Sequence, residues 1–465
     1  MSTAMDLCRV TIVAPRRRID LSLPADVPLA HMLPTLLRAA GENLADAGLA
    51  HSGWALQRLD DAPLDPAQTL SALRVMDGEV LYFRPRMAQL PEMSFDDVAD
   101  VIATGIKERS DRWRPHSTRS AGLWGGAGLL GSGAVALAAS GPPWPIPAAA
   151  AAVIALLLVV FGAVMSRALG DAEAGAVMGY LAVPYAFLGG LLTPARDTVS
   201  IVFDVGAPHM LAGFGAATLA AIVGGAVIAE GLPNFLGITV AALTGTIAAG
   251  VVVAVPDAPP AGAAAACVAL VVALTALIPS LSFKLARLPL PAVPSSAEEL
   301  RSDTTLVNGK AVLARTAVAD KFATGLVAGV AMVAIAAELF LTVEGGWMAV
   351  LMGLAISLAL ILRARVFRGR LQRVWMLAAG LAGVGILAVG GVDPSEPLRT
   401  LVAVVLPLVA ATILTVGLGM WLPGNKPTPF WGRAGDILDV IVVVSLIPLA
   451  LGVLDLYTWI RGQTG

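Results

Sequence analysis

The chain has 465 residues, of which 57% are hydrophobic and only 14% are charged. Soluble globular domains carry about 25% charged residues, so this composition excludes a wholly soluble protein. The formal net charge of −2 provides no overall basic field for nucleic acid, and we expect no nucleic-acid partner.

The first 119 residues are the polar part of the chain. They contain 14 of the 31 Lys and Arg residues, and they hold no apolar run near the roughly 20 residues that cross a bilayer. The N-terminus, MSTAMDLCRV, lacks the basic and then apolar pattern of a cleaved signal peptide. We therefore expect a soluble domain that starts at Met1.

Residues 1–90 are predicted to form an α+β domain, because short alternating segments indicate strands and regularly spaced leucines indicate a helix. The expected elements are a strand over 8–13, a basic turn over 14–18, a strand over 19–23, a helix over 29–38, and strands over 54–58 and 80–83. Asp26 and Pro28 mark the helix start, and Pro34 is expected to kink the helix or to separate its first turn. The order ββαβ…β is that of a β-grasp.

Residues 91–119 are predicted to form an amphipathic linker helix. Phe95, Val98, Ile102 and Ile106 recur at a spacing that places them on one helical face. Such a face is typical of a contact surface for another protein. It is equally typical of a connector that lies on the first membrane helix, and the sequence leaves both interpretations open.

Residues 120–465 are predicted to be a transmembrane bundle of about eleven helices, since apolar segments of spanning length follow one another without barrel-type alternation. The expected spans are 120–140, 146–166, 174–193, 209–229, 234–254, 261–280, 321–341, 346–363, 371–391, 399–420 and 434–458. The cytoplasmic loop at 281–320 is long for a loop, and we expect it to bind a partner, with a solvated linker as the alternative.

Positive charge sets the expected orientation of this bundle. With residues 1–119 inside, the inner loops and span ends carry 14 Lys and Arg residues and the outer ones carry only three. Seven of the nine tryptophans lie near predicted span ends, as interfacial aromatic residues do. Because the number of spans is odd, we expect a cytoplasmic N-terminus and a periplasmic C-terminus.

Ionisable side chains within spans would indicate a transport pathway. The candidates are Glu230, Glu338, Asp436, Asp439, Asp455 and His209. Glu338 is expected to reach water near the outer end of its span. Asp436 and Asp439 are expected at the start of the last span, where an acid favours the helix N-terminus. None of the candidates is central, so the sequence favours structural roles over an ion-coupled carrier.

Glycines are concentrated in two of the spans, where they allow helix backbones to approach closely. The first span contains Gly122, Gly126, Gly128, Gly131 and Gly133, and the ninth contains Gly380, Gly383 and Gly385. Packing within the chain and a seam with a second copy explain these glycines equally well.

The sequence provides no catalytic, cofactor-binding or metal-binding residues. A phosphate loop is absent, because Gly309-Lys310 lacks the upstream glycine, and HExxH, CxxC and GxSxG are absent as well. Two cysteines and four scattered histidines do not suit a metal cluster. We expect a protein that is not an enzyme and has no cofactor.

Three segments carry a specific resemblance. The segments PADVPLAHMLPTLL, GWALQRLDDAPLDPAQTL and VMDGEVLYFRP resemble the ubiquitin-like domain of the EccD family, whose members also have about eleven transmembrane helices. A cytoplasmic grasp domain joined to so many helices is a rare combination. After the last strand the chain continues Arg84-Pro85-Arg86, without the Gly-Gly ending that conjugation requires.

The resemblance implies a multi-pass structural subunit in the inner membrane, part of a type VII (ESX) secretion system of mycobacteria and their relatives. It implies a second copy of the chain as a partner, together with the EccB, EccC and EccE subunits, of which EccC is the ATPase. Membrane lipid is a further expected partner, and exported proteins would bind only transiently, if at all.

The interpretation that combines these observations is a non-catalytic scaffold of a secretion complex, which docks the ATPase through its cytoplasmic domain. The alternative is a polytopic transporter or permease with an accessory domain. Central charges, internal repeats or matched broken spans would favour the transporter, and we find no convincing internal repeat.

Overall fold

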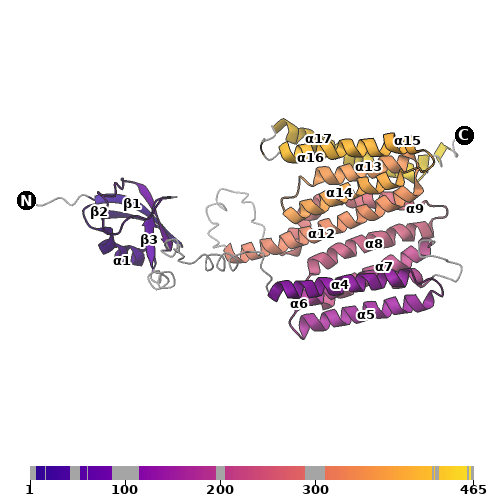
Figure 1. Ribbon diagram of the computed structural model, residues 1–465, viewed down its shortest axis with the longest axis horizontal. Helices are drawn as coiled ribbons and strands as arrows, with labels where there is room; N and C mark the ends of the chain where they lie inside the picture. Colours follow the sequence, from indigo (N-terminus) through magenta and orange to yellow (C-terminus); the bar gives the residue numbers. More distant parts are fainter. Residues whose placement is uncertain are drawn as a thin grey trace, which may run out of the picture. The chain divides into compact units, whose positions relative to one another are not determined.

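The fold is described from a computed structural model of the whole chain (Figure 1). The structure describes residues 7–85, with gaps at 16, 42–52 and 60, and residues 115–461, with gaps at 195–204, 289–308, 422–423, 425–428 and 458–459. The chain divides into two compact units, Met1–Trp113 and Arg114–Gly465, and each is considered by itself. The greater part of the expected linker helix, up to residue 114, lies outside the described residues.

The described residues of the small unit form a four-stranded sheet with one helix, as a β-grasp requires. Its elements are β1 (Leu7–Ala14), β2 (Arg17–Pro24), α1 (Leu29–Ala40), β3 (Trp54–Gln57) and β4 (Glu79–Pro85). The strand order is β2-β1-β4-β3, in which β1 and β4 are parallel and the other two pairs are antiparallel. The expected α+β grasp is confirmed.

The turn between β1 and β2 is tighter than expected. Ala14 pairs with Arg17, so the hairpin turn has only two residues, and Arg17 and Arg18 are exposed residues of β2. The prediction of a basic turn over 14–18 is therefore wrong for Arg17 and Arg18, which belong to strand β2. Antiparallel pairing continues to the last residue that can form it, and charged side chains are tolerated on an exposed strand face.

Helix α1 is continuous, and Pro34 neither breaks it nor separates its first turn. Asp26 does not cap the helix, because the position before the first helical residue is Pro28 and no side chain bonds there. Instead, the first amide groups donate to the 66–69 loop, from Leu29 N to Gln68 O at 2.9 Å and from Ala30 N to Pro66 O at 2.7 Å. These tertiary bonds replace the missing cap.

The core of the small unit lies between the sheet and α1. Val10 and Ile12 of β1 and Leu81 of β4 are fully buried, and Leu29 and Leu36 of α1 cover them. The alternation of buried and exposed residues along β1 is the period-two pattern of a sheet with one buried face. The ubiquitin-like unit thus has an apolar core of its own.

The large unit is helical. Its elements are α4 (Pro115–Ala138), α5 (Pro145–Arg167), α6 (Ala172–Leu192), α7 (Ala207–Val227), α8 (Leu232–Ala254), α9 (Pro260–Leu274), η3 (Thr275–Leu277), α10 (Ile278–Leu285), α12 (Gly309–Glu344), α13 (Gly346–Arg363), α14 (Arg370–Gly390), α15 (Pro397–Thr400), η4 (Leu401–Val405), α16 (Leu406–Trp421) and α17 (Pro429–Val453). Within the described residues, eleven helical segments are long and apolar enough to cross a membrane, as predicted.

Two boundaries differ from the prediction. Helix α4 begins at Pro115, so the end of the expected linker belongs to the first membrane helix. The expected loop at 281–320 is shortened from both sides, because α10 continues to Leu285 and α12 begins at Gly309, and the short helix expected near 297–301 lies outside the described residues. Good helix formers between residues 309 and 320 extend α12 beyond the apolar stretch that defined the span.

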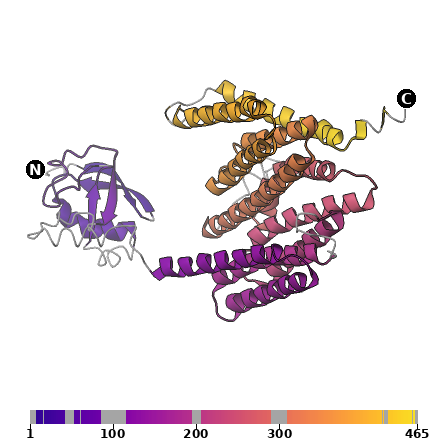
Figure 2. The same cartoon turned by 45° about the vertical axis from the view of Figure 1, so that its right-hand side comes forward.

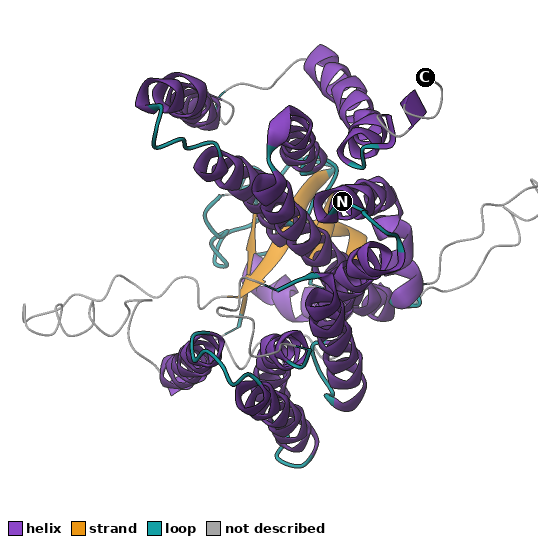
Figure 3. Cartoon of the chain, turned by 90° about the vertical axis from the view of Figure 1, so that its right-hand side faces the viewer, coloured by secondary structure: helices purple, strands orange, loops and turns teal. Residues whose placement is uncertain are grey.

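The interior of the bundle is built around α12. Val327 and Ala331 of this helix are fully buried, and residues of α9, α13 and α17 complete the same apolar core. Figure 2 shows the membrane helices running side by side, and Figure 3 shows the bundle close to end-on. Between α9 and α10 the helix tightens into the 3₁₀ turn η3, so one of the eleven spans is interrupted.

Candidate functional site

Glu338 lies in a junction of three membrane helices. Its residue is only 1% exposed, and Ser357 Oγ of α13 donates a hydrogen bond to Glu338 Oε1 of α12 at 3.0 Å. Glu338 Oε2 is buried and has no hydrogen-bond partner among the described residues. The expectation that Glu338 reaches water is therefore wrong. Its position near the end of a span does not reveal that neighbouring helices cover it.

Two glycines make room for this carboxyl group. A Cβ atom on Gly353 of α13 would lie 2.5 Å from Glu338 Oε2, and one on Gly383 of α14 would lie 2.7 Å from Glu338 Oε1. Both distances are shorter than real contacts, so a side chain at either position would displace the carboxyl group. The sequence left open whether Gly383 packs within the chain or contacts a second copy. The structure shows that it packs within the chain.

A second buried polar contact joins α9, α13 and α17. Arg363 Nε lies 3.5 Å from Asp439 Oδ1, and the two side chains are 12% and 17% exposed. Arg363 also donates to Val272 O and Thr275 Oγ1, where α9 gives way to η3. Because α17 already begins at Pro429, Asp439 lies well inside the last helix and not at its start as predicted.

The remaining candidates lie near helix ends. Asp436 forms an exposed ion pair with Arg365 at 3.3 Å, and Glu230 lies in the bend between α7 and α8. Asp455 follows α17 with a positive φ of 55°. His209 lies in the first turn of α7, where its Nδ1 accepts a hydrogen bond from Gly206 N at 3.2 Å. The structure does not bring these residues together.

The candidate residues are too dispersed to form a metal centre within the described ranges. Among the residues that the structure describes, no three His, Cys, Asp or Glu side chains are grouped as metal ligands. The ion pairs described above join helices that are neighbours in the bundle. Chemically, this arrangement can hold helices in register.

The glycines of α4 have more open surroundings than Gly380 and Gly383 of the ninth span, α14. Helix α4 contains no buried residue, and a Cβ atom on Gly122, Gly126, Gly128 or Gly131 would meet no other atom within 4 Å. Only at Gly133 would it meet a neighbour, the Tyr185 hydroxyl of α6 at 2.7 Å. The segment formed by α15, η4 and α16 also contains no buried residue. Helix α4 packs one side against α5 and α6, through Leu130, Ala134, Leu137 and Ala138, and leaves its glycine-containing side open.

The ubiquitin-like unit presents a charged cluster beside β4. Arg58 Nε donates to Glu79 Oε1 at 2.5 Å, and Met76 N donates to Glu79 Oε2 at 2.8 Å. Burial on its own raises the pKa of Glu79, but the bonds from Arg58 and Met76 outweigh it and hold the pKa below its ordinary value of 4.5. Asp77 accepts from Arg9 N at 2.6 Å, so the cluster also ties β1 to the turn before β4.

Comparison with known proteins identifies both units. A family described as "EccD-like transmembrane domain" matches residues 118–463. The chain belongs to the EccD family. A second family, described as "WXG100 protein secretion system (Wss), protein YukD", matches residues 7–83, which contain the sheet and helix of the small unit. The expected resemblance is confirmed.

Individual EccD relatives match along nearly the whole chain. The chain is 25% identical over 476 residues to "ESX-4 secretion system protein eccD4" of Mycobacterium tuberculosis (strain ATCC 25618 / H37Rv), covering 98% of this chain and 97% of that protein. It is 26% identical over 504 residues to "ESX-3 secretion system protein EccD3" of the same strain, covering 99% of each.

Two solved structures share the fold. "Structure of protomer 1 of the ESX-3 core complex" has a TM-score of 0.58 at 20% identity and covers 98% of this chain and 100% of that one. "MycP5-free ESX-5 inner membrane complex, State II" has a TM-score of 0.55 at 21% identity and covers 88% and 99%. The chain therefore shares the fold of these two structures, and it is a multi-pass membrane protein of the EccD family.

Sequence reasoning missed the two polar contacts that join the helices. In the sequence, Arg363 is one of the inner Lys and Arg residues that set the expected orientation or contact lipid, and nothing singles out Ser357. Ser357 and Glu338 are 19 residues apart, and Arg363 and Val272 are 91 apart, so no local spacing connects them. The available signals were a carboxyl group, Glu338, in the seventh span and a concentration of glycines in the ninth, which do not follow each other in the chain.

Proposed function

We propose that this EccD chain is a non-catalytic structural membrane subunit of a type VII (ESX) protein secretion complex. In this proposal it docks the partner ATPase through its ubiquitin-like domain and builds part of the membrane portion of the machine. The observation that carries the proposal is that two membrane-length segments, α4 and the α15–α16 segment, contain no buried residue. Helices that their own chain covers so little leave faces free for helices of other chains.

The open face of α4 supports a helix from another chain as the occupant. Without a hydrophobic driving force in the bilayer, helices associate through close packing at small residues. Gly122 and Gly126 have GxxxG spacing and no neighbour within 4 Å, so a second backbone can approach them. We propose as membrane partners a second copy of this chain and the EccB, EccC and EccE subunits, with lipid around them.

The ATPase-docking role rests on the small unit and is tested by its removal. Deletion of residues 1–90 should leave an inserted bundle that no longer retains the ATPase when the complex is purified from native membranes. A milder variant, R17E/R18E, reverses two exposed charges on β2 with little effect on folding, and it should reduce ATPase recovery. Normal ATPase recovery after the full deletion would contradict docking through this domain.

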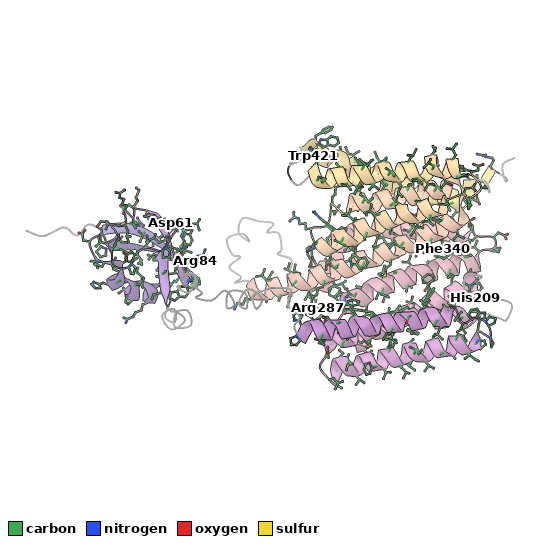
Figure 4. All side chains as sticks on the ribbon, viewed as in Figure 1. Asp61, Arg84, His209, Arg287, Phe340 and Trp421 are labelled. Carbon is green, nitrogen blue, oxygen red and sulfur yellow. The ribbon has the colours of Figure 1, made fainter. Side chains whose placement is uncertain are left out.

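We propose that residues 1–119 are cytoplasmic and that the C-terminal tail is periplasmic. Basic residues at one end of the helices support this orientation. Arg119 at the start of α4 pairs with Glu173 at 2.5 Å, and Figure 4 shows Arg287 at the opposite end of the bundle from His209. Reporter fusions after residues 89 and 463 should localise to opposite sides, and localisation of both to one side would contradict the proposed topology.

A transporter is the second candidate function, and one observation favours it. Glu338 is a buried carboxyl group with an oxygen that has no partner, which is a feature of some proton pathways. Among the described residues, however, Ser357 is its one side-chain hydrogen-bond partner, and Gly353 and Gly383 enclose it. This setting supports a contact that holds helices together more than a relay. The Glu338→Gln variant separates the two functions.

A further inference from the structure

The sheet of the ubiquitin-like unit has an open edge at β2. In the strand order β2-β1-β4-β3, the strands β2 and β3 each have one neighbour (Figure 1). The chain itself covers the end of β3, because Pro63 pairs with Gln57 and Leu64 N donates to Leu56 O at 2.8 Å. No described residue pairs with the outer side of β2. The longer of the two edge strands is therefore the one left open.

The register of β2 on β1 shows which of its backbone groups face this edge. In an antiparallel pair, opposite residues alternate between those that bond to each other and those whose backbone groups point away from each other. Arg9 uses both of its backbone groups on the β4 side, where its N donates to Asp77 Oδ1 and its O accepts from Gly78 N, each at 2.6 Å. Its opposite residue, Ser22, therefore directs its amide and carbonyl groups away from β1.

The same alternation applies to Arg18 and Asp20, so three amide groups and three carbonyl groups face the open edge. All eight residues of β2 pair one-to-one with β1, so no bulge interrupts the strand, and its one proline is the last residue, Pro24. Bulges, prolines and short length are the usual means of preventing a further strand from pairing. Residues 17–23 have none of them, and their backbone is a template for an added strand.

The side chains of β2 indicate what such a strand would carry. Ile19 and Leu21 lie opposite Ile12 and Val10, on the face of the sheet that α1 covers. Ile12 and Val10 are fully buried, whereas Ile19 and Leu21 are only half-buried, because no further strand lies beside them. A strand paired with β2 would place every second side chain on this face. Aliphatic residues at those positions would complete the burial of Ile19 and Leu21.

The charge of the edge favours an acidic occupant. Arg17 and Arg18 are exposed at the hairpin end of β2, and neither forms an ion pair with a described residue. Asp20 is the one acidic residue of the strand, and it already accepts a hydrogen bond from Thr11 Oγ1 at 2.5 Å. Acidic side chains on an incoming strand would complement the two arginines, whereas basic ones would be repelled.

We propose that the open edge of β2 binds an extended segment of a partner protein as an added strand. The segment carries aliphatic residues at alternate positions, which cover Ile19 and Leu21, and an acidic residue beside Arg17 or Arg18. This inference rests on the proposed docking through the ubiquitin-like domain, and it specifies the chemistry of the docked segment and its mode of binding.

Amide hydrogen exchange at single-residue resolution tests the proposal. The full chain in detergent is compared with the same chain in the complex purified from native membranes. In the complex, the amides of Arg18, Asp20 and Ser22 should exchange at least about ten-fold more slowly, whereas those of Ile19 and Leu21, which face β1, should change less than about two-fold. A uniform change along β2, or none, would overturn the proposal. Slow exchange of the three outward amides in the isolated chain would also overturn it, because the edge would then be occupied by the chain itself or by a second copy.

Two pairs of variants separate the backbone and charge contributions. Ser22→Pro removes one outward amide and no bond to β1, since proline is tolerated on an edge strand whose N–H faces outward. It should lower recovery of the docked partner about five-fold, and Ser22→Thr, which keeps the amide, should not. R17E/R18E should lower recovery, and R17K/R18K should preserve it. Higher recovery with R17E/R18E would indicate a basic segment and overturn the proposal.

Deletion of residues 1–90 distinguishes failure of this inference from failure of the docking role. A partner that is retained after the deletion contradicts docking through the domain. A partner that is lost after the deletion, but is recovered normally with folded Ser22→Pro protein, leaves docking in place and overturns pairing at the β2 edge. If Ser22→Pro does not fold, the alternating exchange pattern of the wild-type complex decides.

Discussion

Ser357 of α13 and Glu338 of α12 are joined by a hydrogen bond of 3.0 Å, and Gly383 of α14 closes the third side of the junction. The polar groups lie inside a membrane helix bundle, where an unpaired polar group is costly. Separating the carboxyl group from Ser357 would therefore cost free energy. The hydrogen bond fixes α12 against α13, and the close contact with Gly383 fixes α14 against both. This contact and the Arg363–Asp439 pair suggest specific tests.

Replacing Gly383 with Ala should destabilise the bundle. The new Cβ would lie 2.4 Å from Ser357 Oγ and 2.7 Å from Glu338 Oε1, so the junction has to open. Overpacking of this kind costs about 1–3 kcal/mol. Thermal unfolding of the purified protein in detergent measures the loss. Gly385→Ala on the same helix is the control, because its Cβ meets nothing within 4 Å, and equal stability of the two variants would contradict the packing argument.

Glu338→Gln should leave protein export near the wild-type level. Glutamine keeps an acceptor oxygen for the Ser357 hydroxyl and nearly the same volume, but it cannot release a proton. Glu338→Ala, which removes the acceptor and leaves a cavity, should lower the amount of assembled complex. Export of a secreted substrate and recovery of the complex are measured together. Lost export with an intact complex in Glu338→Gln would support the transporter instead.

Breaking the Arg363–Asp439 pair from one side should be strongly destabilising. Arg363→Met leaves the Asp439 carboxylate buried without its cation, a change that costs about 3–5 kcal/mol. The double variant R363M/D439L should recover most of this loss, because no charge remains buried. Unfolding in detergent measures both variants.

Arg365→Met provides the matched comparison for that experiment. It removes the exposed pair between Arg365, in the turn after α13, and Asp436 of α17, and exposed pairs contribute about 0–1 kcal/mol. A similar loss in R363M and R365M would show that burial of the first pair does not matter. An R363M/D439L variant no more stable than R363M would show that the stranded charge is not the cause.

The ubiquitin-like domain should lose stability in acid partly through Glu79. The pKa of Glu79 in the folded domain is held below 4.5, because the bonds from Arg58 and Met76 outweigh burial. The stabilisation is therefore fully present above pH 4.5 and is lost as the pH falls through the lower folded-state pKa. Glu79→Gln should be less stable than wild type at pH 7, and the difference should shrink at low pH. Thermal unfolding of the full chain, followed by a signal from β3 at Trp54, measures the stability difference between the two proteins. A difference that is independent of pH would contradict the prediction.

Several local details could not be predicted from the sequence. Pro34 predicted a kink in α1 or a separate first turn, but the buried face of that helix and the bonds from its first amide groups to the 66–69 loop keep it continuous. The loop expected at 281–320 is shorter, because helix formers without strong hydrophobicity extend α12. Tertiary contacts thus decided the continuity of α1, and helix propensity decided where α12 begins.

The sequence by itself determined the two-part organisation, the eleven spans and the β-grasp. Hydrophobicity over about 20 residues and period-two alternation are properties of neighbouring residues, so they can be recognised without knowledge of the fold. Only the tertiary structure decided the environment of Glu338 and the partners of Arg363, and only it left α4 without a buried residue. Those outcomes depend on which helices become neighbours, because Glu338 and Ser357 are 19 residues apart in the chain and Arg363 and Val272 are 91 apart.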